Sequence, residues 1–156
     1  MMTYEEQLQA IAQPPHPGAI LKNQKGMSYL EAFYVRLTIN RIFGPTSVSV
    51  QALDLRPVQD FMGTDKYDKA RLETEYIASI TLRVLFANGE HRIITGTGGG
   101  TGYGRTAHQD AAKEAESDAI KRACTHLGPA FGTTLYDKNN PLHEGGPCRW
   151  IGYQTN

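Results

Sequence analysis

TAHQDAAKEAESDAIKRACTHLG, residues 106–128, predicts a long helix with one apolar face. Apolar residues recur every three or four positions, which is the period of an amphipathic helix. They are Ala111, Ala112, Ala115, Ala119, Ile120, Ala123, Cys124 and Leu127. Because most of them are alanine, the helix can lie very close to its neighbour, and a flat sheet is the natural partner. Thr106 with Gln109 has capping-box spacing, and Gly128-Pro129 predicts the end.

The polar face of this helix changes sign along its length. The acidic residues Asp110, Glu114, Glu116 and Asp118 precede the basic Lys121, Arg122 and His126. Cations near a helix C-terminus complement the macrodipole, so stability alone would explain the order. The alternative is that Lys121 and Arg122 present a cationic edge to a phosphate backbone. The helix taken alone favours the first interpretation.

Three strands are predicted before the helix. Residues 46–58 alternate apolar and polar side chains, which indicates a half-buried strand, and the polar residues 59–70 indicate a long connection. Residues 72–87 are rich in β-forming residues, and Asn88-Gly89 is a strong hairpin signal before a further strand at 90–97. The glycine-rich residues 96–104 are interpreted as a loop that leads into the helix.

The N-terminal part predicts two helices. Residues 3–12 form a short one capped by Thr3, which PPHPG at 14–18 ends. A connector at 19–28 carries Lys22 and Lys25. A second helix is expected from Ser28, with Glu31 at capping-box spacing, as far as Gly44-Pro45. Its expected buried face is Leu30, Phe33, Tyr34, Leu37, Ile42 and Phe43, and its polar side holds Arg36, Asn40 and Arg41.

The predicted fold class is α+β. An antiparallel three-stranded meander is covered by the alanine-faced helix, which gives a β-β-β-α core with N-terminal helices. We expect one domain over 1–156: an N-terminal helix and connector at 1–28, a core at 29–128 and an irregular C-terminal segment at 129–156 that docks on the rest or on a neighbour.

Composition restricts the function. Sixteen basic and sixteen acidic residues give a formal net charge of zero, which argues against nucleic-acid binding through bulk charge but not against a local cationic stripe. Two cysteines and five histidines show no metal-ligand spacing, and no nucleophile motif occurs. We therefore expect no metal, no cofactor and no catalysis. No apolar run is long enough to span a membrane, and the acidic start indicates no targeting, so a cytoplasmic protein is expected.

The glycine run offers a second function class. GYGRTA, residues 102–107, fits the loose dinucleotide pattern G-x-G-x-x-A between a strand and a helix. The βαβ context that this pattern needs is missing, because only 28 residues follow the helix and they contain no convincing strand. A small nucleotide-using enzyme is kept as an alternative, which nucleotide-induced thermal stabilisation would reveal.

Several segments together carry a family resemblance. YLEAFYVRLTINRIFGP (29–45), the long hairpin, the glycine-bearing segment, AAKEAESDAIKRACTHLGPAFGTTLYDKNNP (111–141) and the lead-in EEQLQAIAQPPHPGAI resemble the core of the Rad52-type single-strand annealing proteins. The resemblance covers roughly residues 3–141. It implies ATP-independent annealing of single-stranded DNA in recombination and repair by a ring or helical homo-oligomer. The chain is similar to the phage and bacterial branches of this family. The resemblance also implies a single-strand-binding protein as a partner.

The resemblance also implies roles for individual residues. Lys121 and Arg122 fall on positions that line the inner DNA groove of the family. Arg105 falls near lysines of a second DNA site in the family, and the resemblance leaves open whether that site binds duplex DNA. Arg36, Arg41, Lys22 and Lys25 are secondary candidates.

The chain departs from the family at three positions. Where the family has a further cation in the last helix, this chain has Thr125, with His126 beside it. Tyr34 takes the place of a basic residue of the early helix, and Pro45 takes the place of an aromatic residue. A self-assembling module of the same fold without DNA binding therefore remains an alternative.

Overall fold

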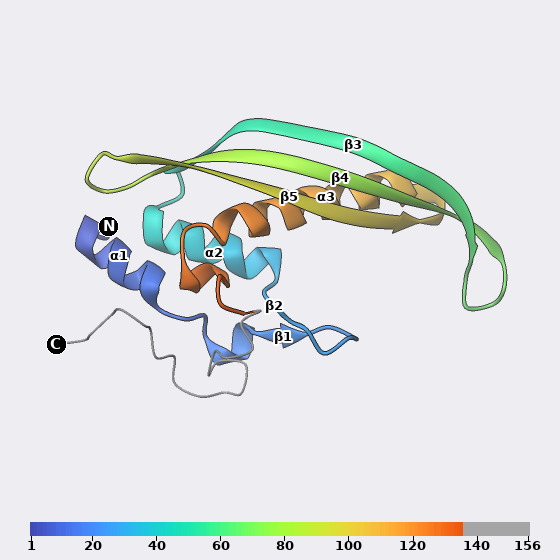
Figure 1. Cartoon of the computed structure of the whole chain (residues 1–156), viewed down its shortest axis with the longest axis horizontal. Coiled ribbons are helices and arrows are strands. Elements are labelled where there is room, and N and C mark those ends of the chain that lie inside the picture. Colours follow the sequence, from blue (N-terminus) through green and yellow to red (C-terminus); the bar gives the residue numbers. More distant parts are fainter. Residues whose placement is uncertain (136–156) are drawn as a thin grey trace.

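The computed structural model describes residues 1–135, and a curved antiparallel sheet forms its long axis (Figure 1). The sheet has the order β3-β4-β5, from β3 (Val48–Thr64), β4 (Ala70–Leu85) and β5 (His91–Tyr103). The helix α3 (Ala107–Cys124) lies along one face, mainly over β5 and β4. The predicted α+β fold, a three-stranded meander covered by an alanine-faced helix, is confirmed.

β5 and α3 pack backbone to backbone because neither element has a large side chain at the contact. The alanines of α3 at every fourth position are buried, and the glycines of β5 at every second position face them: Ala107, Ala111, Ala115, Ala119, Ala123 and Gly96, Gly98, Gly100, Gly102. A β-carbon at Gly102 would lie 1.8 Å from the carbonyl oxygen of Ala107. Two strand residues advance about 6.7 Å and four helical residues about 6 Å, so the two series stay in step.

The glycine run is therefore not the loop that the sequence predicted. Residues 96–103 lie inside β5, and only the short 3₁₀ helix η2 (Gly104–Thr106) connects β5 to α3. The backbone of α3 fills the space that a phosphate cradle would need. The nucleotide alternative loses its structural basis.

β3 is longer and more exposed than predicted. It continues to Thr64, and the expected connection at 59–70 shrinks to a turn before Ala70. Register shifts between Val50 and Ala52 and between Pro57 and Gln59 interrupt its pairing with β4. Almost every β3 residue is exposed because α3 covers β5 and β4 but barely reaches this edge. The prediction of a half-buried strand was wrong.

The predictions for β4 and its hairpin are confirmed. Alternate residues of β4 and the residue after it are buried, namely Ala78, Ile80, Leu82, Val84 and Phe86. Gly89 has φ +86° and donates its N–H to the carbonyl of Phe86, which closes the turn into β5.

The N-terminal helices pack below the sheet in Figure 1. α1 (Tyr4–Ala12) begins with the predicted Thr3 cap, and Thr3 and Glu6 form a full capping box. After η1 (Pro17–Ala19), β1 (Leu21–Lys22) pairs with β2 (Ser28–Tyr29) in a small hairpin.

α2 (Ala32–Phe43) consequently starts four residues later than predicted, and Ser28 does not cap it. Its buried face is also shifted: Val35, Thr38, Ile39, Ile42 and Phe43 are buried. Phe33 and Leu37, which the sequence placed in the core, are exposed, with Phe33 70% exposed.

Thr106 likewise does not form the predicted capping box of α3. Its hydroxyl donates to the carboxylate of Asp110 instead. α3 ends at Cys124 rather than at Gly128, which has φ +146° and a backbone that is extended rather than helical.

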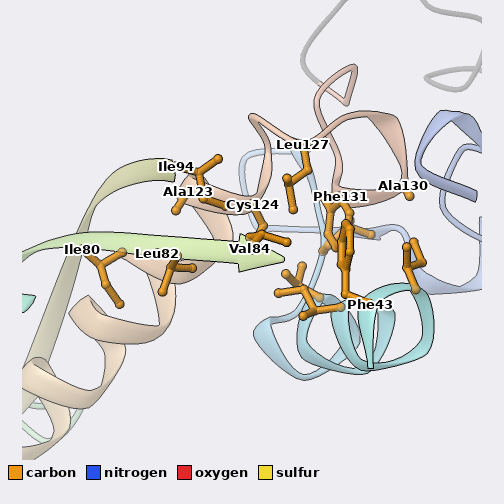
Figure 2. Close-up of a cluster of buried hydrophobic side chains, with 14 of the residues drawn as sticks. Phe43, Ile80, Leu82, Val84, Ile94, Ala123, Cys124, Leu127, Ala130 and Phe131 are labelled. Atoms are coloured by element: carbon orange, nitrogen blue, oxygen red, sulfur yellow. The ribbon is translucent and has the colours of Figure 1, made fainter. Parts of the chain in front are cut away.

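The main core lies where α2, the end of α3, β4 and the segment after α3 meet (Figure 2). That segment contains η3 (Pro129–Phe131), and its Ala130, Phe131 and Leu135 are buried in this core. The remainder of the predicted C-terminal segment, with Trp150 and Tyr153, lies outside the described residues. Cys124 is fully buried, as expected of a small core residue.

Candidate nucleic-acid interface

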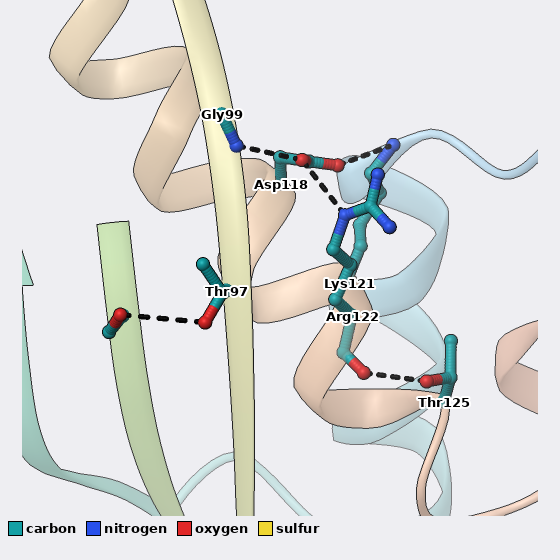
Figure 3. A network of polar contacts seen from close by, with 7 residues as sticks. Thr97, Gly99, Asp118, Lys121, Arg122 and Thr125 are labelled. Carbon is teal, nitrogen blue, oxygen red and sulfur yellow. Dashed lines mark hydrogen bonds and ion pairs between the residues drawn. The ribbon is translucent and has the colours of Figure 1, made fainter. Parts of the chain in front are cut away.

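Lys121 and Arg122 lie in the last turn of α3 and share one carboxylate (Figure 3). Arg122 donates from Nε to Asp118 at 3.0 Å, and Lys121 Nζ lies 3.9 Å from the other Asp118 oxygen. Asp118 also accepts the backbone N–H of Gly99 in β5, at 3.0 Å. One half-buried acid therefore connects both predicted DNA-binding cations to the neighbouring strand.

A groove with a volume of about 660 Å³ opens beside this turn, and we call it the α3 groove. Its walls come from three regions: the end of α3, the strand residues Thr95–Thr97, and Tyr29 of β2. Residues 131–133 and the apolar side chains of Leu30, Val35 and Leu135 complete the lining.

Tyr29 orients one of the groove cations. Lys121 Nζ lies 5.7 Å from the centre of the Tyr29 ring, within the range of a cation–π interaction. The Lys121 side chain is only 27% exposed, whereas that of Arg122 is 58% exposed. Lys121 is thus held inside the groove, and Arg122 is the more accessible of the two cations.

Thr125 and His126 also line the α3 groove. Thr125 donates its hydroxyl to the carbonyl of Arg122, at 2.6 Å, and accepts from Thr133 at its own carbonyl. The resemblance implies a third cation at this position. Thr125 instead connects the end of α3 to the segment after it.

The other family departure, Tyr34, has a structural contact of its own. Its hydroxyl accepts the backbone N–H of His16, at 3.1 Å, which ties α2 to the N-terminal connector. Pro45 is exposed immediately after α2.

The secondary candidates are not gathered around the groove. Arg36 is exposed on α2, and Arg41 lines a separate hollow beside α1. Arg105 lies in η2, at the opposite end of α3. Lys22 and Lys25 belong to the β1–β2 hairpin and are exposed, and none of these five lines the α3 groove.

Sequence reasoning missed two residues of the groove. Asp118 lies three and four residues before the cations, which is the helical pairing distance, so this spacing could have indicated the shared carboxylate. Tyr29 reaches the groove only through tertiary packing, and nothing local in the sequence signals that contact.

A second polar chain joins three elements near the start of α3. Tyr76 of β4 contacts Nδ1 of His108 at 2.7 Å, and His108 Nε2 lies 3.1 Å from Asp60 of β3. Thr74 donates to the same Asp60 carboxylate. This chain connects the exposed edge strand to α3. Within residues 1–135, no group of three His, Cys, Asp or Glu side chains is placed to hold a metal ion.

The match to a known family covers most of the chain. The model of the Rad52/22 family of double-strand break repair proteins matches residues 3–144. The chain belongs to this family.

Membership in the Rad52/22 family places the protein in DNA repair and recombination, with strand annealing as the general activity. The matched residues include both α3 cations and the whole sheet. No curated protein sequence matches the chain. Among the described residues of this Rad52/22 protein, every helix is too short or too polar to cross a membrane.

Proposed function

We propose that this protein binds single-stranded DNA along the α3 groove and anneals complementary strands without ATP, as a homo-oligomeric ring or filament. The observation that carries the proposal is the pairing of Lys121 and Arg122 at one groove, at the end of α3. These are the positions that the resemblance to annealing proteins assigns to the inner DNA groove.

Annealing requires no covalent chemistry from the protein. It requires strands that are held by their backbone, without preference for sequence, so that the bases can pair. Cations achieve this by displacing counterions from phosphates. Lys121 and Arg122 against Asp118 leave one net positive charge at the groove of a chain whose overall formal charge is zero. Repetition of that charge around an oligomer supplies the avidity.

The exposed edge of β3 supports assembly. Val50, Leu53, Leu55 and Met62 pair with residues of β4 whose side chains face α3, so they lie on that same side of the sheet. All four are exposed, with Val50 57% and Met62 66% exposed, and we call them the β3 shelf. An unpaired edge with apolar side chains is a template for another chain.

A self-assembling module without DNA binding is the second candidate function. Thr125 favours it, because this residue occupies the place of a third cation and is committed to structural hydrogen bonds. Steep salt dependence of single-strand binding separates the two functions, since a module that contacts only protein would not bind the oligonucleotide.

We propose the remaining basic residues as secondary contacts. Arg105 is assigned to a second DNA site. The other four residues are proposed to contact the DNA strand outside the α3 groove: Arg36, Arg41, Lys22 and Lys25. A single-strand-binding protein is the proposed partner that delivers the strand.

The decisive experiment removes the two groove cations. Lys121→Ala with Arg122→Ala is expected to abolish binding of a fluorescent oligo-dT at physiological ionic strength and to leave the oligomer intact in light scattering. Lys66→Ala with Lys69→Ala, in the exposed turn between β3 and β4, removes the same charge and should bind as the unchanged protein does. Unchanged binding by the groove variant would refute the proposed interface.

A further inference from the structure

Asp118 is the one acidic residue that lines the α3 groove within residues 1–135, and its carboxylate contacts both cations. Its side chain is 23% exposed. It contacts Lys121 and Arg122 and accepts the Gly99 N–H, so the same carboxylate serves the fold and the groove. An acid at this place reduces the attraction of the groove for phosphate.

The anchoring contact with β5 does not need a negative charge. A neutral amide oxygen in the same position can still accept the Gly99 N–H and the Arg122 Nε–H, although its bond to the guanidinium is weaker than that of the carboxylate. A helix pair at this spacing contributes little to stability. The charge of Asp118, as distinct from its oxygen atoms, therefore acts mainly on the two cations.

We propose that Asp118 is a positioning residue that holds Lys121 and Arg122 in place and limits how tightly they grip a DNA backbone. The inference rests on the proposed function. It gives the groove a specific property: cations that are already oriented but partly neutralised bind phosphate weakly enough for strands to be released and exchanged. The hydrogen bond from Arg122 Nε to Asp118 fixes the orientation of the guanidinium group, which carries five N–H donors in all.

The size of the effect follows from the charge. Removing one negative charge about 6 Å from a phosphate in water changes affinity about threefold for each engaged subunit. In an oligomer that contacts one strand through several subunits, the effect is larger.

The test is Asp118→Asn, measured with oligo-dT by fluorescence anisotropy over a range of salt concentrations. We expect at least about threefold tighter binding, a steeper salt dependence and slower release of the bound strand. Asp118→Glu keeps the charge and should retain the original affinity and salt slope. Glu90→Gln, in the exposed β4–β5 turn, changes the net charge equally and should alter neither.

The outcomes separate this inference from the proposed function. If Lys121→Ala with Arg122→Ala abolishes binding while Asp118→Asn binds no more tightly than the unchanged protein, the role of Asp118 is refuted and the interface stands. If the cation variant binds normally, the interface itself is refuted.

Asp118→Ser provides a second neutral side chain, and binding tighter than that of the unchanged protein is expected from it, although the shorter side chain no longer holds the two cations in place. Failure of both neutral variants to fold would overturn the inference, because Asp118 would then be a structural residue first.

Discussion

A β-carbon at Gly98 of β5 would lie 2.2 Å from the backbone nitrogen of Ala119 in α3. That distance leaves no room for any side chain between strand and helix. The same relationship recurs at Gly96, Gly100 and Gly102, so the whole length of the contact depends on two series of very small residues. The position of the groove cations depends on it as well, because Asp118 directly precedes Ala119 in α3 and Lys121 follows it by two residues.

Gly98→Ala is therefore expected to destabilise the protein strongly. The added methyl group meets backbone, which cannot move without displacing α3, so the free energy of unfolding should fall by about 2–3 kcal/mol or more. Gly99→Ala is the matched control, since a β-carbon there has no neighbour nearer than the Tyr76 carbonyl oxygen at 3.8 Å. Urea unfolding of both variants measures the difference, and equal midpoints would contradict the packing described.

Gln7 is expected to be a key residue of the N-terminal helix. It is 2% exposed, donates to the carbonyl of Ile42 at 3.1 Å and accepts the N–H of Ala87 at 2.8 Å. Gln7→Leu leaves both backbone groups unsatisfied, which should lower the free energy of unfolding by about 2–4 kcal/mol. The exposed Gln9→Leu should have little effect, and thermal unfolding that fails to distinguish the two variants would refute this role.

The β3 shelf should be required for assembly. Leu53→Lys with Leu55→Lys places two charges on an edge that is already exposed in the subunit, so folding should survive while the oligomer dissociates. Size-exclusion chromatography with light scattering measures the mass, and circular dichroism checks the fold. Gln51→Lys, at an exposed polar position of the same strand, is the control. An oligomer of unchanged mass in the double variant would exclude the shelf as the interface.

Cys124 should be unreactive in the folded protein. Burial raises the pKa of its thiol to about 12, so almost no thiolate, the nucleophilic form, exists near neutral pH. In a Cys148→Ser background, a thiol reagent at pH 8 should label the protein only after denaturant is added. Rapid labelling without denaturant would show that Cys124 is accessible.

The same pKa shift predicts a dependence of stability on pH. The pKa in the folded state is higher than the unfolded value of 9.0, so the contribution of the protonated thiol is complete below that value. It should decline as the pH rises from about 9 toward about 12. Unfolding free energies of the protein and of Cys124→Ala, compared at pH 8 and pH 10.5, should converge at the higher pH.

The parts of the fold that local periodicity determines were predictable from the sequence. The alanine series of α3 and the alternation of β4 each describe a face that is buried by a neighbour along the chain. Asn88-Gly89 specifies its turn by backbone preference alone. Thr3 caps α1 as predicted, and Glu6 completes a capping box with it.

The failures have tertiary causes. Residues 96–103 look like a loop because glycine weakens strands, yet here glycine is what allows α3 to approach. β3 is exposed because α3 covers β5 and β4 instead, and the alternation of a strand does not show which element will cover its apolar face. At Ser28 and Thr106, strand pairing and the Asp110 carboxylate replaced the predicted caps.

The site was only half predictable for the same reason. Lys121 and Arg122 were selected from the helix and from the family resemblance, and the structure places both at the groove. Tyr29 arrives there from β2, whose residues were predicted to begin a helix. The assignment of Lys121 and Arg122 to DNA binding stays a prediction, as do those of Arg36, Arg41, Arg105, Lys22 and Lys25.

The glycine–alanine packing also determines how the groove responds to a ligand. Main-chain atoms have no rotamers to adjust, so we expect α3 and β5 to move together as one rigid unit. The spacing between the end of α3 and Thr97 is then set before any DNA strand binds. If a strand binds in the α3 groove as proposed, the ordering entropy is expected to be lost mainly by the nucleic acid, because the spacing of the protein groups is already fixed.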